Sequence, residues 1–259
     1  MSSLYSTDAP DSYIFSATIS IVKTLEVLLM SKVAWIIFGA VIVVVLGGLV
    51  VYSRVSNPSI DVSSIDTNSA TVASAQNGEI ADHVYGKADS KVVFVEYGDF
   101  QCPSCGGAYA QVKSATEEYK DKVAFIFRNF PLTTKHPNAR AAAGAAEAAG
   151  LQNKYWEMHD VLYEGQSSWE NLTGDNRTNV FVGYAKQLGL DTEKFKTDLA
   201  SSAVNKKISF DQAIGKKIGV NATPTFYLNG KQLSDSDAGQ IVQGSKTVLT
   251  GLFDKALAN

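Results

Sequence analysis

Cysteine is the residue that this chain has least of: its 259 residues include two, Cys102 and Cys105. No second cysteine pair is present, and His83, His136 and His159 stand alone, without the spacing of zinc ligands. A structural zinc site needs four ligands, so we expect no metal site at the pair. A disulfide between them closes too short a loop to stabilise a fold much. Reversible redox chemistry is therefore favoured over an inert structural pair.

An excess of positive charge is also absent. The chain has 23 lysines and arginines against 26 acidic residues, a net charge of −3, which gives no basic surface for nucleic acid. No phosphate-binding glycine loop, dinucleotide motif or internal repeat is found. The sequence therefore predicts no nucleic-acid partner, and the thiol pair requires no bound cofactor.

The residues around the pair place it between a strand and a helix. Residues 91–97 form a β-branched and aromatic run typical of a buried strand, which 98–101 interrupt. A helical period follows Pro103, at Ala108, Val112, Ala115 and Tyr119. Free N–H groups at a helix start favour a thiolate, so Cys102 is expected to be the nucleophile. Cys105, one turn later, is the expected buried resolving thiol.

Three places in the chain resemble the DsbA-like disulfide oxidoreductases of the thioredoxin superfamily. They are the motif Asp99–Cys105 after a strand, the acid Glu96 before it, and the Thr-Pro loop and strand at Ala222–Gly230. The resemblance spans roughly residues 79–259. It implies an α/β, thioredoxin-like fold with a helical insertion at about 132–218.

The resemblance also implies roles for individual residues. Glu96 would be a buried proton acceptor for Cys105, although a carboxylate on a strand can also simply face water. Pro224 would be a cis-proline whose preceding residue, Thr223, pairs with an extended substrate. The alternative is an ordinary turn before an edge strand.

The dipeptide between the cysteines is expected to contact substrate and to tune the redox potential. Strong oxidants of this family often carry a histidine there, whereas this chain has Pro103 and Ser104. A serine donates one hydrogen bond but brings no positive charge. The sequence therefore leaves open where the potential lies between those of thioredoxin and DsbA.

Apolar patterns predict the remaining elements. Strands are expected at 123–127, 225–228 and 240–243. Helices are expected at 139–149, 155–163, 180–188, 192–200, 204–217 and 246–258. The hairpin signal Asn229-Gly230 closes the strand after Pro224.

An uncharged apolar run precedes this domain. Val33–Tyr52 has twenty residues, about 30 Å as a helix, which matches the hydrocarbon core of a bilayer. A cleaved signal peptide is the rival interpretation, but no small-residue cleavage site follows the run directly. We therefore expect a single transmembrane helix that stays attached.

Flanking charge predicts the orientation of this anchor. Lys23 and Lys32 precede the run and Arg54 follows it, so residues 1–32 are expected in the cytoplasm and the thiol domain outside the cell membrane. Translation could also begin at Met30. Residues 53–78 are polar and read as a flexible tether.

The sequence thus predicts a membrane-anchored, extracytoplasmic thiol–disulfide oxidoreductase that introduces disulfides into exported proteins. Its partners would be reduced exported proteins and an unidentified reoxidant, either a membrane protein or a small molecule. The alternatives are a disulfide reductase or isomerase, and a tethered chaperone-like module whose thiols are incidental.

Overall fold

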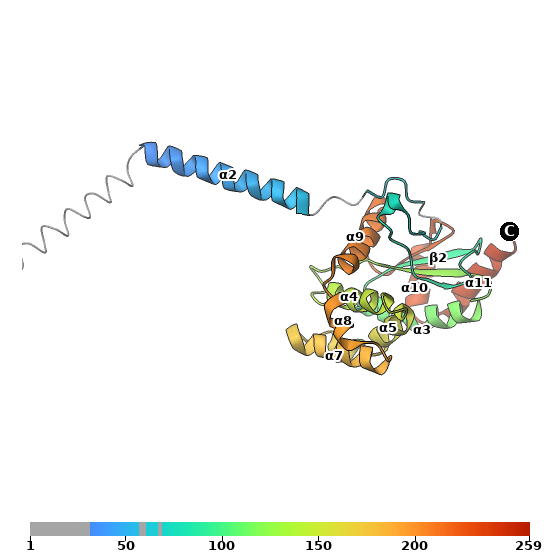
Figure 1. Ribbon diagram of the computed structural model, residues 1–259. Coiled ribbons are helices and arrows are strands. Elements are labelled where there is room, and N and C mark those ends of the chain that lie inside the picture. The colour runs from blue at the N-terminus through green and yellow to red at the C-terminus, as the bar shows by residue number, and fades with distance from the viewer. Residues whose placement is uncertain (1–31, 57–60, 67–68) are drawn as a thin grey trace, which may run out of the picture. The chain divides into compact units, whose positions relative to one another are not determined.

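The chain divides into two units, Met1–Ser59 and Ile60–Asn259, which are considered separately. The computed structural model describes residues 32–56, 61–66 and 69–259 (Figure 1). The predicted cytoplasmic segment before residue 32, with its alternative start at Met30, lies outside the described residues.

The first unit contains one described helix, α2 (Lys32–Ser56), which includes the predicted anchor at 33–52. Nowhere in the described part of the chain is a helix long and apolar enough to cross a membrane. The transmembrane anchor therefore remains a prediction.

A five-stranded mixed sheet forms the centre of the second unit, in the order β1-β3-β2-β4-β5. Its two central strands, β2 and β3, are parallel, and the other neighbours are antiparallel. The strands are β1 (Val84–Gly86), β2 (Val93–Gly98), β3 (Ala124–Asn129), β4 (Thr225–Leu228) and β5 (Lys231–Gln232). The sequence predicted β2, β3 and β4 correctly, whereas the short β1 and β5 were not predicted as strands.

Helices between β3 and β4 form the predicted insertion. They are α4 (Ala139–Gly150), α5 (Tyr155–Glu164), α6 (Gln166–Trp169), α7 (Gly174–Gln187), α8 (Thr192–Asp198) and α9 (Ser202–Lys217). The other helices are η1 (Ala75–Asn77), α3 (Pro103–Glu118), α10 (Asp235–Val242) and α11 (Lys246–Leu257). The strand predicted at 240–243 is wrong, because the Ser234 side chain accepts a hydrogen bond from the Asp237 N–H and begins α10 there.

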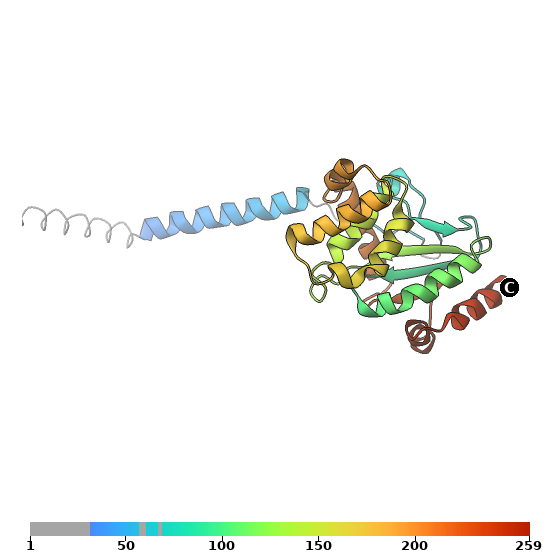
Figure 2. The same ribbon diagram turned by 90° about the horizontal axis from the view of Figure 1, so that it is seen from below.

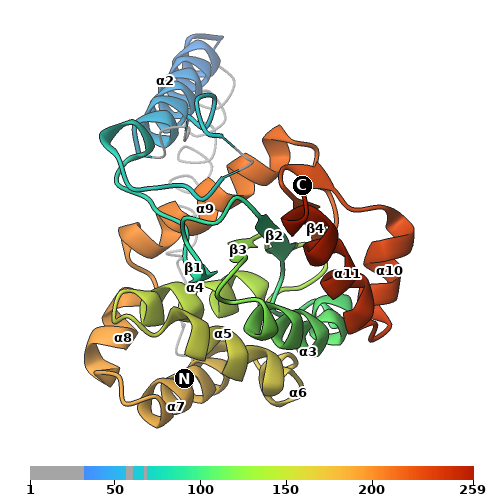
Figure 3. The same ribbon diagram turned by 90° about the vertical axis from the view of Figure 1, so that its right-hand side faces the viewer.

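The two faces of the sheet carry different helices. Side chains of β2 alternate, so Phe94 belongs to the core beneath α3, α5 and α11, whereas Val93 and Val95 belong to the core beneath α9. Figure 3 shows α9 on one side of the sheet and α3 with α11 on the other. In Figure 2 the green helix α3 runs alongside the strands. Glu96 shares the parity of Phe94, which directs it toward α3.

The tether predicted at 53–78 differs from the structure. Its described residues beyond α2, together with 79–83, form an arm (residues 61–66 and 69–83) that packs on the second unit. Val62 is buried in the core beneath α9. The Lys217 ammonium on α9 donates to the carbonyls of Val62, Ser63 and Ile65 at 2.8, 2.8 and 3.2 Å. Polar composition suggested a tether, yet the backbone carbonyls of this segment bind a distant lysine.

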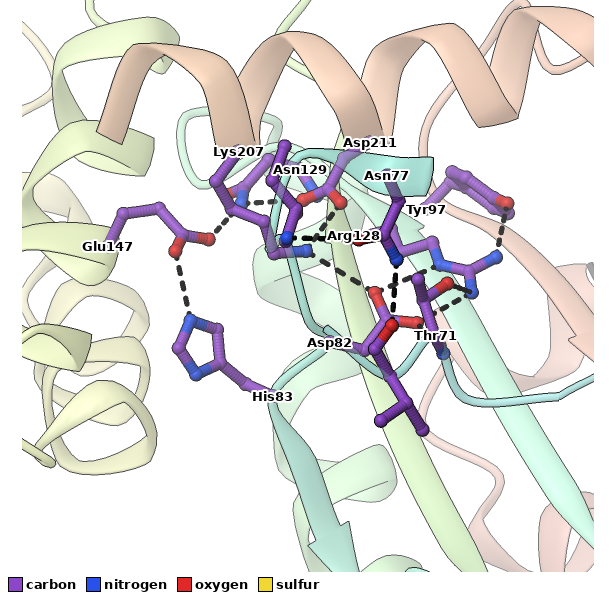
Figure 4. A network of polar contacts seen from close by, with 12 residues as sticks. Thr71, Asn77, Asp82, His83, Tyr97, Arg128, Asn129, Glu147, Lys207 and Asp211 are labelled. Carbon is purple, nitrogen blue, oxygen red and sulfur yellow. Dashed lines mark hydrogen bonds and ion pairs between the residues drawn. The ribbon is translucent and has the colours of Figure 1, made fainter. Parts of the chain in front are cut away.

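A buried network of ion pairs also holds the arm (Figure 4). Arg128 on β3 lies 2.7 Å from Asp82 Oδ2 and donates to the Thr71 hydroxyl at 3.3 Å. Lys207 on α9 lies 3.3 Å from Asp82 and 2.5 Å from Asp211. Burial alone would raise the pKa of Asp82, but the charges of Lys207 and Arg128 hold it well below its usual value. These pairs connect the arm, β3 and α9.

Candidate active site

Cys102 occupies the N-cap position of α3, at the end of the short loop that follows strand β2, as predicted. Pro103 takes the first helical position, which suits its fixed φ and missing N–H. The Cys102 N–H donates to the Asp99 carbonyl at 3.0 Å, and its thiol contacts the Thr223 carbonyl at 3.3 Å. Only 6 % of Cys102 is exposed, less than expected for a helix start, because the loop containing Thr223 covers it.

The environment of Cys102 favours its thiolate. A hydrogen bond from the Cys105 thiol is the largest influence and, with the N–H groups of Cys105 and Ser104, outweighs burial. Together these groups lower the pKa of Cys102 to about 5. Both thiols are free. Cys102 is therefore ionised at neutral pH and able to act as nucleophile or leaving group.

Cys105 has the opposite environment. It is fully buried one turn into α3, and burial raises the pKa of its thiol well above the usual value, with the charges of Glu96 and Cys102 adding to the effect. Glu96 is 3 % exposed, so it does not face water. Burial, and then the charge of Cys102, raises the pKa of Glu96 to about 8. A neutral acid is thus held beside a protonated thiol.

Asp99 organises the loop before the cysteines. Its carboxylate accepts from the Gln101 and Leu132 N–H groups at 2.8 and 2.9 Å and lies 2.8 Å from His136 Nδ1. His136 therefore supports the loop through Asp99. The sequence pointed to the motif containing Asp99 but not to this role, since Leu132 and His136 lie 33 and 37 residues from it.

The helical insertion supplies further polar support that the sequence did not predict. Gln166 donates to the carbonyls of Phe100 and Cys102 at 2.7 and 3.2 Å. Gln101 accepts from the Asn138 N–H at 2.6 Å and donates to the Glu170 carbonyl at 2.7 Å. No local pattern marks Gln166, because its importance depends entirely on tertiary contact.

The Thr-Pro loop lies against the thiols. The Thr223–Pro224 peptide bond is cis, as predicted. Both residues are half-buried, whereas Pro103 and Ser104 are exposed. Pro103 and Ser104 are thus accessible beside the thiol, and their contact with substrate stays a prediction. Across the described ranges, no group of three or more histidine, cysteine or acidic residues is arranged to hold a metal ion.

The geometry just described can be compared with that of known proteins. Residues 79–243 match the family model described as Thioredoxin. The chain belongs to the thioredoxin family. This match includes both cysteines, Glu96 and the Thr-Pro loop.

Relatives by sequence are longer proteins. The Na(+)/H(+) antiporter NhaA 1 of Salinispora arenicola is 40% identical over 151 residues, which cover 58% of this chain and 22% of that protein. The antiporter of the same name from Mycolicibacterium vanbaalenii is 37% identical over 153 residues, covering 58% and 23%. The chain thus spans less than a quarter of the length of these relatives.

Solved structures with a similar fold include thiol–disulfide oxidoreductases. Oxidised BdbD from Bacillus subtilis has a TM-score of 0.58 at 25% identity, covering 69% of this chain and 94% of BdbD. A thioredoxin-like oxidoreductase from Silicibacter pomeroyi has a TM-score of 0.50 at 27% identity, covering 62% and 90%. The thiol–disulfide exchange protein alpha-DsbA2 from Wolbachia pipientis shares the fold, with a TM-score of 0.55 at 20% identity over 67% of this chain and 86% of its own. The family model and these solved structures agree on a thioredoxin-like fold.

Proposed function

We propose that the protein oxidises dithiols of exported proteins through the pair Cys102 and Cys105. The observation that carries this proposal is the position of Cys102 at the N-cap of α3 with Cys105 fully buried one turn later, which lowers the pKa of Cys102 to about 5 and raises that of Cys105. A stabilised thiolate stabilises the reduced form of the pair, and a stable reduced form makes the disulfide a strong oxidant. Ser104 brings no charge, so the thiolate depends on hydrogen bonds within α3 instead.

The proposed reaction starts from the disulfide. A client thiolate attacks the Cys102 sulfur, the bond between the cysteines breaks, and Cys105 leaves as a thiolate. Neutral Glu96 is the buried acid positioned to give Cys105 its proton. A second client thiolate attacks the client sulfur of the mixed disulfide and releases Cys102 as a thiolate. The client loses two electrons and two protons. One proton replaces that of Glu96, and the other enters solvent.

The redox potential of the pair tests whether the protein oxidises or reduces its clients. Because the Cys102 thiolate is stabilised, we expect a potential nearer to about −120 mV, as in DsbA, than to about −270 mV, as in thioredoxin. Equilibration in glutathione buffers followed by thiol trapping measures it. The protein should also oxidise a reduced, unfolded client, and Cys102→Ser should abolish this activity. A potential near that of thioredoxin would favour a reductase, and a wild type that binds the reduced client without oxidising it would favour a binding module.

We further propose that the domain is anchored to the cell membrane and lies on its extracytoplasmic side. The support is the uncharged run at 33–52 and the exposure of the described apolar side chains of α2, such as Trp35, Phe38 and Leu46. A helix that is apolar all round needs an apolar environment. Lys23 and Lys32 before the run favour a cytoplasmic N-terminus. Reduced exported proteins and a membrane or small-molecule reoxidant would then be the partners.

A further inference from the structure

The proposed reaction requires a proton to reach the buried thiol of Cys105. Cys105 is 0 % exposed and Glu96 is 3 % exposed. Client oxidation delivers a proton to Cys105, and reoxidation of the pair removes it. Glu96 must therefore exchange a proton with solvent in each turnover, although it has little direct contact with solvent.

Three buried polar atoms on α5 have no hydrogen-bond partner among the described residues. They are His159 Nε2 and the hydroxyls of Tyr155 and Tyr163. His159 and Tyr163 are four apart, so they lie on one face of the helix, and their rings are 5.1 Å apart. An unpaired buried polar atom costs about 1–3 kcal/mol, so such atoms on one helix call for a functional reason.

Tyr163 borders the space around the resolving cysteine. Its ring lies 5.0 Å from that of Phe100, in the loop before Cys102, and 6.1 Å from that of Phe127. Phe127 in turn borders Glu96, because a side chain at Gly98 would meet both the Phe127 ring and Glu96 Oε1. Burial raises the pKa of Tyr163, and Cys105 and Glu96 are the next strongest influences on it.

His159 continues the path toward solvent. Its Nδ1 lies 3.1 Å from Asp160 Oδ1, and the Asp160 side chain is 29 % exposed. Asp160 also pairs with Lys113 on α3 at 2.9 Å. Burial lowers the pKa of His159, which keeps its ring neutral and able to accept at one nitrogen while donating at the other.

We propose that Tyr163 and His159 relay protons between the buried pair of Glu96 and Cys105 and the surface at Asp160. Both are positioning residues that act through Glu96, and the relay rests on the proposed redox function. A cavity of about 40 Å³ lined by His159, Asp160 and Lys113 has room for a water between His159 and the surface. During client oxidation the relay returns a proton to Glu96 after Glu96 has protonated Cys105. During reoxidation the proton leaves Cys105 by the same route.

A reaction with oxidised glutathione lets two steps be measured separately: formation of a mixed disulfide at Cys102 and its resolution by Cys105. Reduced protein is mixed with oxidised glutathione: the Cys102 thiolate forms a mixed disulfide, then Cys105 loses its proton and resolves it. Acid quenching and mass spectrometry follow both species. In Tyr163→Phe the first step should keep its rate, whereas resolution should slow on the order of tenfold or more and its solvent deuterium isotope effect should rise. His159→Phe should give the same result, and the double variant should resolve no more slowly than either single variant.

Tyr155→Phe is the matched control. Tyr155 lies on α5, is buried, and also has an unpaired hydroxyl, but the strongest charge acting on it is that of Glu147 in the network of Figure 4. Its resolution rate should equal that of the wild type. Wild-type resolution rates in both Tyr163→Phe and His159→Phe, or equal slowing in Tyr155→Phe, would overturn the relay. The redox potential of the wild type is measured separately, so failure of the relay is distinguishable from failure of the proposed oxidant role.

Discussion

Two thiols on one helix turn have opposite chemistry because their positions on α3 differ. Cys102 receives hydrogen bonds at the helix start, whereas Cys105 lies in the core beside Glu96. In the proposed reaction this difference assigns nucleophilic attack to Cys102 and the proton-dependent step to Cys105. The order follows from geometry alone, since the two residues have the same intrinsic pKa.

The Cys102 thiolate should make the stability of the reduced protein depend on pH. Its pKa falls from an ordinary value of 9.0 in the unfolded chain to about 5 in the folded one. A lowered pKa contributes stability that is complete above pH 9 and is lost as pH falls through 5. The oxidised protein has no such thiol, so the stability of the reduced form relative to it should rise between pH 5 and 8. Denaturant unfolding of both forms measures this difference.

Reduced Cys102→Ser is the control for that experiment, because it lacks the titrating thiol. Its stability should follow the pH dependence of the oxidised wild type. Parallel curves for reduced and oxidised wild type would contradict a stabilised thiolate.

For single residues, the sequence predicted the position of a side chain on its helix or strand better than it predicted the side chain's surroundings. The positions of Cys102 and Cys105 on the helix were predicted, because strand and helix periods are local. The burial of Glu96 was left open, since a residue on a strand can face either the core or water. The contact between Cys102 and the Thr223 carbonyl depends on tertiary packing, as 121 residues separate them.

Among the elements, the arm shows how a polar segment can belong to a folded core. Its backbone carbonyls and Thr71 bind Arg128, which is buried in the domain, and Lys217, which is exposed on α9. Hydrogen bonds to charged groups contribute more than those between neutral groups. Composition could not reveal this arrangement, because a polar sequence is equally suited to solvent and to a buried cation.

Two truncated chains test the arm. A chain that begins at residue 61 keeps all its described contacts, whereas a chain that begins at Glu79 keeps Asp82 but loses Val62 and Thr71. Arg128 and Lys217 then lose carbonyl and hydroxyl partners, so we expect the shorter chain to be less stable by about 3 kcal/mol or more. That is roughly 10 °C in Tm for a domain of this size. Thermal unfolding of both chains measures this difference in stability, and equal Tm values would mean that the arm is a flexible tether.

For the whole molecule, the two units are expected to have different functions, redox chemistry in one and membrane attachment in the other. The thioredoxin-like unit contains its own core, both cysteines and the Thr-Pro loop. The first unit contributes α2, whose described apolar side chains are exposed. Large exposed apolar surfaces mark interaction sites or membrane segments. The proposed disulfide formation requires an oxidising compartment, which is one reason for proposing an extracytoplasmic domain.

Cell fractionation tests the anchored arrangement. Because residues 33–52 are uncharged and apolar, the full chain should remain in washed membranes, and a chain beginning at residue 61 that is exported by a cleavable signal should be released. Protease added to intact spheroplasts should digest the thiol domain of the full chain and leave a cytoplasmic control protein intact. Replacing Val43 and Val44 with lysine should weaken membrane retention, since charges at the centre of a span cost several kcal/mol. A domain protected from the protease would place the thiols in the cytoplasm, and a full chain found in the soluble fraction would exclude the anchor.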